Sequence, residues 1–201
     1  MNIKLYIQWG DVLPNGEVHW QRKRLCKSFL KQFMQFMEIA LCHNYGGGST
    51  TNILDTSNTL RTISAWYGID CFYTYKFLGT LAELTNANYG IVVGTGVNAV
   101  TTSDYALQTP IANGAGAGQL SYGLTGYVGT VTLPGSCTLQ LTRTFINNSG
   151  GDITVKEIAL VCASGNTVAV ECYFCLTRDL QTQLIAAGGS KIAVISIVTA
   201  L

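Results

Sequence analysis

The chain has 201 residues, enough for one substantial hydrophobic core plus a small appendage. Only 11% of the residues are charged, against roughly 25% in an average soluble protein, and 48% are apolar. A free monomer normally covers its surface with charged side chains, so this composition predicts a chain that hides much of its surface against other subunits. The net charge of +1 excludes a general electrostatic attraction to nucleic acid.

Neither terminal region predicts a membrane segment. The most apolar late stretch, residues 192–201, contains Ser196 and Thr199 and is much shorter than the roughly 20 residues of a spanning helix. The first residues lack the basic, apolar and small-residue pattern of a secretory signal. We therefore expect a soluble chain made in the cytoplasm, without a membrane span.

Cysteine usage predicts reduced, buried thiols. Seven cysteines, an odd number, are scattered along the chain, and no secretory signal favours disulfides. Cys172 and Cys175 lie in a strand-like run, where residues three apart point to opposite faces, whereas a zinc site needs a turn there. The two histidines, His19 and His43, are far from them in sequence. We expect no metal and no cofactor.

In chain order, the first predicted elements are a hairpin and a helix. Residues 3–9 alternate apolar and polar, Pro14-Asn15-Gly16 indicates a turn, and residues 17–20 return as a second strand. From Arg24 to His43 apolar residues recur at helical spacing, and glycines 46–48 end this pattern. The apolar stripe of the predicted helix comprises Leu25, Phe29, Phe33, Met37 and Leu41, widened by Leu30, Met34 and Phe36.

The remainder is predicted to be β. Short apolar runs alternate with turn residues, and Gly-rich turns at 147–152 and 164–166 indicate hairpins. The predicted strands are Leu60–Trp66, Cys71–Leu84, Gly90–Val93, Tyr105–Thr109, Leu120–Tyr122, Tyr127–Leu133, Thr138–Ile146, Ile153–Cys162, Thr167–Leu176 and Lys191–Val198. This pattern favours an antiparallel β-sandwich or jelly roll over residues 49–201. Residues 1–48 would then be an N-terminal hairpin plus amphipathic helix that covers an edge or docks onto a neighbour.

One motif superficially resembles a nucleotide-binding loop. Residues 94–99 read Gly-Thr-Gly-Val-Asn-Ala after an apolar run, but a dinucleotide site needs a helix to begin there. The residues that follow are β-branched and turn-like, and no carboxylate lies about 20 residues further on. The motif therefore predicts a tight turn between strands.

Few titratable residues suggest chemistry. Neither histidine lies in a setting that suggests a catalytic triad. Asp104 could be a metal ligand or a general base, but its position favours the cap of a turn. The pair Arg178-Asp179 predicts a hydrogen-bonded bend, with orientation of a ligand as the alternative, and Arg143 and Glu157 are expected to pair across the 147–152 hairpin. We expect no enzyme activity.

Charge is distributed unevenly. The cluster Arg22-Lys23-Arg24, with Lys27 and Lys31, is most simply a solvated helix face, with nucleic acid or an acidic partner as alternatives. Across residues 84–142, in contrast, Asp104 is the only charged residue, and residues 114–118 read Gly-Ala-Gly-Ala-Gly. We expect a neighbouring subunit to cover this neutral stretch, with backbones close together.

Five stretches, taken in order, resemble a pattern found in small virion structural proteins of tailed bacteriophages. They are Thr-Ser-Asp-Tyr-Ala-Leu-Gln-Thr-Pro-Ile (102–111), Gly-Gln-Leu-Ser-Tyr (118–122), Arg-Thr-Phe-Ile-Asn-Asn-Ser-Gly (143–150), Ile-Thr-Val-Lys-Glu-Ile-Ala-Leu (153–160) and Thr-Arg-Asp (177–179). The resemblance covers residues 89–199 and implies a β-sandwich subunit, trimeric or ring-forming, with no catalytic residues. The candidate assembly-interface residues in this pattern are Asp104, Tyr105, Pro110, Ile111, Gln119, Tyr122, Arg178 and Asp179.

The sequence thus predicts a virion protein that assembles with itself and attaches to the tail, neck or capsid, beside other virion proteins. One alternative is a host-surface or glycan-binding module of a tail fibre, favoured by turn aromatics such as Tyr105, Tyr122 and Tyr127. Another is a depolymerase, which requires clustered carboxylates around a groove.

Overall fold

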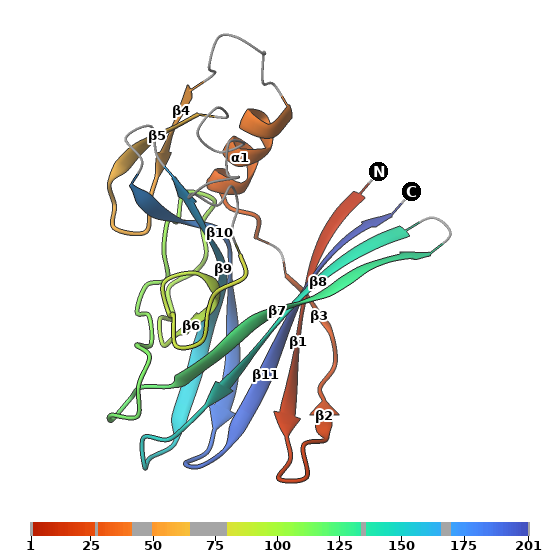
Figure 1. Ribbon diagram of the computed structural model, residues 1–201, viewed down its shortest axis with the longest axis vertical. Coiled ribbons are helices and arrows are strands. Elements are labelled where there is room, and N and C mark those ends of the chain that lie inside the picture. The colour runs from red at the N-terminus through yellow and green to blue at the C-terminus, as the bar shows by residue number, and fades with distance from the viewer. Residues whose placement is uncertain are drawn as a thin grey trace.

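The protein is described by a computed structural model that covers residues 2–26, 28–41, 50–64, 80–133, 136–165 and 170–200 (Figure 1). Over these ranges it is mainly β, with eleven strands and one helix. The elements are β1 (Asn2–Val12), β2 (Val18–Trp20), β3 (Arg24–Cys26), α1 (Lys31–Leu41), β4 (Thr50–Leu54), β5 (Leu60–Ser64), β6 (Gly90–Gly94), β7 (Ser121–Leu133), β8 (Ser136–Ile146), β9 (Ile153–Gly165), β10 (Glu171–Ile185) and β11 (Ser190–Ala200).

The strands form three antiparallel sheets. The large sheet has the order β2-β1-β11-β8-β7, and β3 pairs with β1 beside β2. The small sheet has the order β10-β9-β6, and β4 and β5 form a separate hairpin. β1 pairs with β11 over its whole length, so the two ends of the chain lie next to each other at one end of the sheet (Figure 1). The N-terminal strand is therefore an integral part of the large sheet.

Alternation of side chains explains which face of the large sheet is covered. Ile7, Ile195 and Leu141 are neighbours in register on β1, β11 and β8, and all three are buried in the hydrophobic core. The next row, Gln8, Val194 and Thr142, points to the opposite face because successive residues of a strand alternate. The strands predicted at residues 3–9, 138–146 and 191–198 are confirmed.

The predicted hairpin at residues 147–152 is wrong. β8 belongs to the large sheet and β9 to the small one, so this segment carries the chain between sheets. The buried Asn147 amide donates to the carbonyls of Gly151 and Ile185 at 2.8 Å, and its oxygen accepts from the Ser149 backbone N–H at 3.1 Å. These bonds close the connection without strand pairing. By contrast, β9 and β10 do pair antiparallel on both sides of the second predicted hairpin; its Ser164 and Gly165 lie in β9, and Asn166 lies outside the described residues.

The predicted helix begins later than its sequence pattern suggests. Residues 24–26 form β3 and pair with Leu5–Ile7 of β1, and the helix begins at Lys31. Its buried side is centred on Phe36 and Ile39, whereas Met34 of the predicted stripe is 62% exposed. The Phe36 ring meets Phe174 of β10 edge-on at 5.2 Å, which docks α1 onto the small sheet. Tertiary pairing with β1 therefore overrides the local helical spacing.

Other predictions need smaller corrections. Residues 105–109 form no strand, the runs at 120–122 and 127–133 merge into β7, and β10 continues nine residues beyond the predicted end at Leu176, to Ile185. β4 was not predicted, whereas β5, its partner in the hairpin, confirms part of the strand predicted at 60–66. The predicted strand at 71–84 lies mostly outside the described residues.

A buried arginine joins the two larger sheets. Arg143 of β8 is 1% exposed and donates to the backbone carbonyls of Tyr89 and Ile91 at 2.9 and 3.0 Å and of Gly123 at 2.8 Å. Further acceptors are the carbonyls of Glu83 and Asn86. The expected pair between Arg143 and Glu157 is wrong, because β8 and β9 lie in different sheets. Burial lowers the pKa of Arg143 to about 10, so the guanidinium stays charged at neutral pH.

Replacing this arginine should cost much of the stability. Arg143→Met leaves several buried carbonyls without a donor, so we expect the free energy of unfolding to fall by about 3 kcal/mol or more in urea titrations. The exposed Arg22 provides the control, since Arg22→Met should change stability by less than about 0.5 kcal/mol. Equal effects of the two substitutions would contradict the role of Arg143.

Candidate functional site

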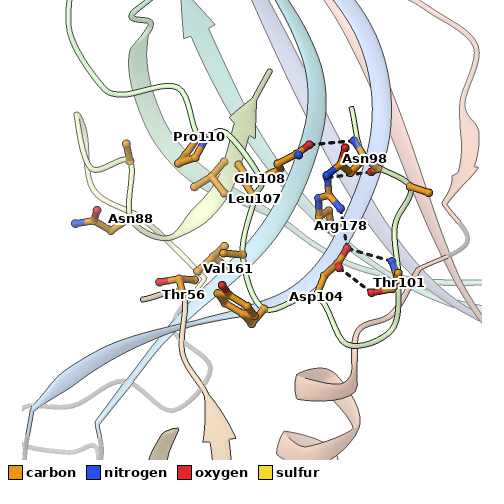
Figure 2. A pocket seen from close by; sticks show the side chains of 15 residues that line it. Thr56, Asn88, Asn98, Thr101, Asp104, Leu107, Gln108, Pro110, Val161 and Arg178 are labelled. Atoms are coloured by element: carbon orange, nitrogen blue, oxygen red, sulfur yellow. Dashed lines mark hydrogen bonds and ion pairs between the residues drawn. The ribbon is translucent and has the colours of Figure 1, made fainter. Parts of the chain in front are cut away.

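A pocket of about 750 Å³ lies where the loop of residues 98–110 faces β9, β10 and the β4–β5 turn (Figure 2). This volume is in the range of small-molecule sites. Val92, Leu107 and Val161 supply apolar lining, and polar side chains come mainly from the loop. The lining polar residues are Thr56, Asn88, Asn98, Thr101, Asp104, Tyr105, Gln108 and Arg178.

The buried Glu157 carboxylate fixes the loop. Glu157 is 0% exposed in the middle of β9. Its Oε1 accepts hydrogen bonds from the backbone N–H groups of Gly96 at 3.0 Å and Thr109 at 2.8 Å. Its Oε2 accepts from the Gln108 backbone N–H at 3.0 Å and from Arg178 Nε at 2.8 Å. The two ends of the loop are thus tied to one carboxylate, and a fully bonded buried charge is tolerated.

Arg178 extends this network to the pocket wall. Its Nη1 lies 2.7 Å from Asp104 Oδ2, and its Nη2 donates to the Asn98 carbonyl at 3.2 Å (Figure 2). Burial lowers the pKa of Arg178, but its bonds to Glu157 and Asp104 more than offset this and raise it. The guanidinium therefore stays charged and connects β9, β10 and the loop.

Asp104 also caps its own turn, as predicted. Its carboxylate accepts from the Thr101 backbone N–H at 3.1 Å and from the Thr101 hydroxyl at 2.7 Å. Burial raises the pKa of Asp104, and the bonds from Thr101 and Arg178 outweigh it, so the pKa lies below its ordinary value. Asp104 is thus held ionised. The predicted Arg178-Asp179 bend is wrong, because both residues lie inside β10 and Asp179 instead accepts from Gln181 at 2.8 Å.

The glycine motif at 94–99 has a structural reason. β6 ends at Gly94 and no helix begins after it. A Cβ atom on either Gly94 or Gly96 would lie 2.5 Å from Glu157 Oε1. The spacing of the glycines therefore leaves room for the carboxylate. The predicted tight turn between strands is wrong, because no strand follows β6 until β7 begins at Ser121.

The structure brings half of the candidate interface residues together. Asp104, Tyr105, Pro110 and Arg178 line the pocket. Ile111 and Tyr122 are buried, and the Tyr122 hydroxyl donates to the Ile111 carbonyl at 2.8 Å, so Tyr122 is not the exposed turn aromatic that the glycan alternative assumed. Gln119 lies apart from the pocket and accepts from the Gly116 backbone N–H at 3.0 Å.

Sequence reasoning missed several polar residues of the site. Glu157 was assigned to a cross-strand pair, and Thr56, Asn88, Asn98, Thr101 and Gln108 were not singled out. Gln108 Oε1 accepts from the backbone N–H groups of Val97 at 2.9 Å and Asn98 at 3.0 Å, which stabilises the loop next to the pocket. The one usable signal was that Glu157 is a lone carboxylate directly before the apolar run of residues 158–163, since such residues are buried only when bonded.

The described residues offer little else for metal or thiol chemistry. No group of three or more His, Cys, Asp or Glu side chains among them could hold a metal ion. Cys26, Cys162, Cys172 and Cys175 are buried free thiols and Cys137 is a half-buried one, while Cys42, Cys71 and His43 lie outside the described residues. Burial raises the pKa of Cys175 to about 12, which keeps its thiol protonated.

Comparison with known proteins gives no relative. No protein-family model, curated protein or solved structure matches the chain. In the part of the chain that the structure describes, no helix is long and apolar enough to cross a membrane.

The role of Glu157 predicts a specific glycine effect. Gly96→Ala places a methyl group against the carboxylate, so we expect the free energy of unfolding to fall by about 1–3 kcal/mol in chemical denaturation. Gly151→Ala is the matched control, because nothing lies within 4 Å of a Cβ atom there, and it should change stability by less than about 0.5 kcal/mol. A neutral Gly96→Ala would show that the carboxylate does not fix the loop.

The lowered pKa of Asp104 predicts a pH dependence. A carboxyl group with a lowered folded-state pKa contributes stability that is complete above its ordinary pKa and is lost as the pH falls through the lowered value. The stability difference between the unmodified chain and Asp104→Asn should therefore be constant above pH about 4 and shrink below it. Denaturation curves across this range measure the difference, and a gap that grows on acidification would contradict the assignment.

Proposed function

We propose that this chain is a non-catalytic structural subunit that assembles with copies of itself, as a trimer or ring, within a virion of the tailed-phage type. In this proposal the large and small sheets form a β-sandwich or jelly roll, and the subunit attaches to other virion proteins in the tail, neck or capsid. Virion membership rests on the resemblance of residues 89–199. Self-assembly rests on a surface of the fold.

That surface is the outward face of the large sheet. It consists of the side chains that alternate with the core row on the two central strands: Thr138, Gln140, Thr142 and Thr144 of β8 and Ile192, Val194, Ser196 and Val198 of β11. None of these residues is charged, and Val194 and Ser196 are already buried within the chain. The charged residues of the same strands, Arg143 and Lys191, are both buried. On the adjoining strand β1, the exposed Lys4 is in register with Val198 and shares this face.

Such a face suits contact with another flat surface. An antiparallel sheet with one solvated face normally carries polar and charged side chains there. Here threonine hydroxyls and β-branched methyl groups replace charges, so burying the face desolvates few strongly hydrated groups. Leu124 of β7, whose neighbour Thr125 pairs with the inward-facing Arg143, is 63% exposed at the edge of this sheet and extends the apolar surface.

Inserting a charge tests this proposal. Thr142→Lys places an ammonium group at the middle of the face, so we expect a shift from oligomer to monomer in native mass spectrometry or light scattering. Thr154→Lys is the matched control, because Thr154 is also a half-buried strand threonine but lies on β9 of the small sheet.

Two results would contradict self-assembly through this face. One is an unmodified chain that behaves as a 21.6 kDa monomer at every concentration. The other is an oligomer that Thr142→Lys leaves intact while Thr154→Lys dissociates it. Mass spectrometry of purified phage particles that carry the gene tests virion membership separately.

A further inference from the structure

We propose that the pocket around Tyr105 binds a neutral saccharide. This inference goes beyond assembly, because the pocket is lined by the loop, β9, β10 and the β4–β5 turn, and none of its lining residues belongs to the outward face of the large sheet. It rests on the charge, the free polar atoms and the fixed shape of the pocket.

The charges disfavour an anionic ligand. Asp104 and Arg178 are the charged residues that line the pocket, and they bond to each other at 2.7 Å. Arg178 also forms an ion pair with the buried Glu157, which does not itself line the pocket. The three groups together carry one positive and two negative charges. Among the described lining residues no unpaired cation is left to balance a phosphate or carboxylate, and both carboxylates already bond to Arg178, so a neutral ligand fits best.

The remaining polar atoms suit hydroxyl groups. Within the described chain, the Tyr105 hydroxyl, the Gln108 Nε2 amide and the Thr56 hydroxyl have no hydrogen-bond partner, although all three residues line the pocket. Gln108 Oε1 is occupied by backbone donors, which holds the amide plane in place. Hydroxyl and amide groups both donate to, and in part accept from, the hydroxyls of a sugar.

The apolar lining of the pocket suits the C–H faces of a sugar ring. Val92, Leu107 and Val161 line the pocket together with the half-buried Tyr105. A pyranose presents C–H groups on its faces, which pack against aromatic and aliphatic side chains, while its edge carries the hydroxyls. A volume of about 750 Å³ accommodates more than one sugar ring.

The site is also organised before any ligand arrives. Four bonds to the Glu157 carboxylate, one of them from Arg178, and two further bonds from the Arg178 guanidinium fix the loop that carries Tyr105 and Gln108. A ligand therefore orders little of the loop on binding, which favours useful affinity from a small contact area.

Saturation-transfer NMR on the full chain tests the proposal. The probes are glucose, galactose, mannose, N-acetylglucosamine and their β-linked disaccharides, with glucuronic acid as the anionic counterpart of glucose. We expect saturable binding of at least one neutral probe, with a Kd on the order of 1 mM or tighter, and weaker binding of glucuronic acid than of glucose.

Substitutions place the binding in this pocket. Tyr105→Ala should weaken the affinity at least about tenfold, while Tyr127→Ala, which removes an exposed tyrosine outside the pocket, should leave it unchanged. Tyr105→Phe and Thr56→Val each remove one hydroxyl and keep the shape, so each should weaken binding by a few fold even if Tyr105→Ala does not fold.

Three results would overturn the inference. They are no saturable binding by any neutral probe, glucuronic acid binding as tightly as glucose, and affinity unchanged in both Tyr105→Phe and Thr56→Val. The oligomeric state is measured on the same samples. If the unmodified chain is an oligomer but binds no sugar, only the saccharide proposal is contradicted. If it is a monomer that binds sugar, only the assembly proposal is contradicted.

Discussion

The Glu157 carboxylate is the contact on which the rest of the candidate site depends. Four hydrogen bonds from the backbone of one loop and from Arg178 converge on this buried group. They determine why glycine stands at 94 and 96 and where the pocket wall lies. A carboxylate held in this way by an arginine and amides serves architecture, unlike the pair of free carboxyl groups that glycoside hydrolysis requires.

The two proposals divide the molecule by chemistry. On the large sheet, β8 and β11 present buried apolar residues to the core and uncharged residues, most of them β-branched, to the opposite face. Beside the small sheet, Arg178 forms ion pairs with Asp104 and Glu157. The other polar groups that line the pocket are hydroxyl and amide groups. In the two proposals, low charge therefore has two different roles: it permits a contact surface on the large sheet, and on the small sheet it leaves a pocket whose charged side chains are paired with one another.

The sequence predicts those features that local periodicity determines. Alternation located β1, and short apolar runs between turn residues located β8 and β11. Turn residues also located the β1–β2 turn, where the Leu13 N–H donates to the Glu17 carbonyl at 2.8 Å. The start of α1 and the 147–152 connection were wrong, because pairing with β1 and the bonds of Asn147 come from distant segments. The site shows the same limit: Asp104 was correctly placed at a turn, but its partner Arg178 is 74 residues away, and no spacing rule connects them.

The position of β11 in the large sheet has a consequence for synthesis on the ribosome. β11 lies between β1 and β8, yet it follows both in the chain. Among the described strands, β1 has only the short strands β2 and β3 as partners while the chain emerges, and β8 has only β7. The small sheet can pair earlier, because β6, β9 and β10 all precede β11. The large sheet therefore closes last, through contacts of very high sequence separation, and such contacts form slowly. Until β11 inserts, the open edges of β1 and β8 are exposed, which makes this interval the time when a nascent chain most needs protection from aggregation.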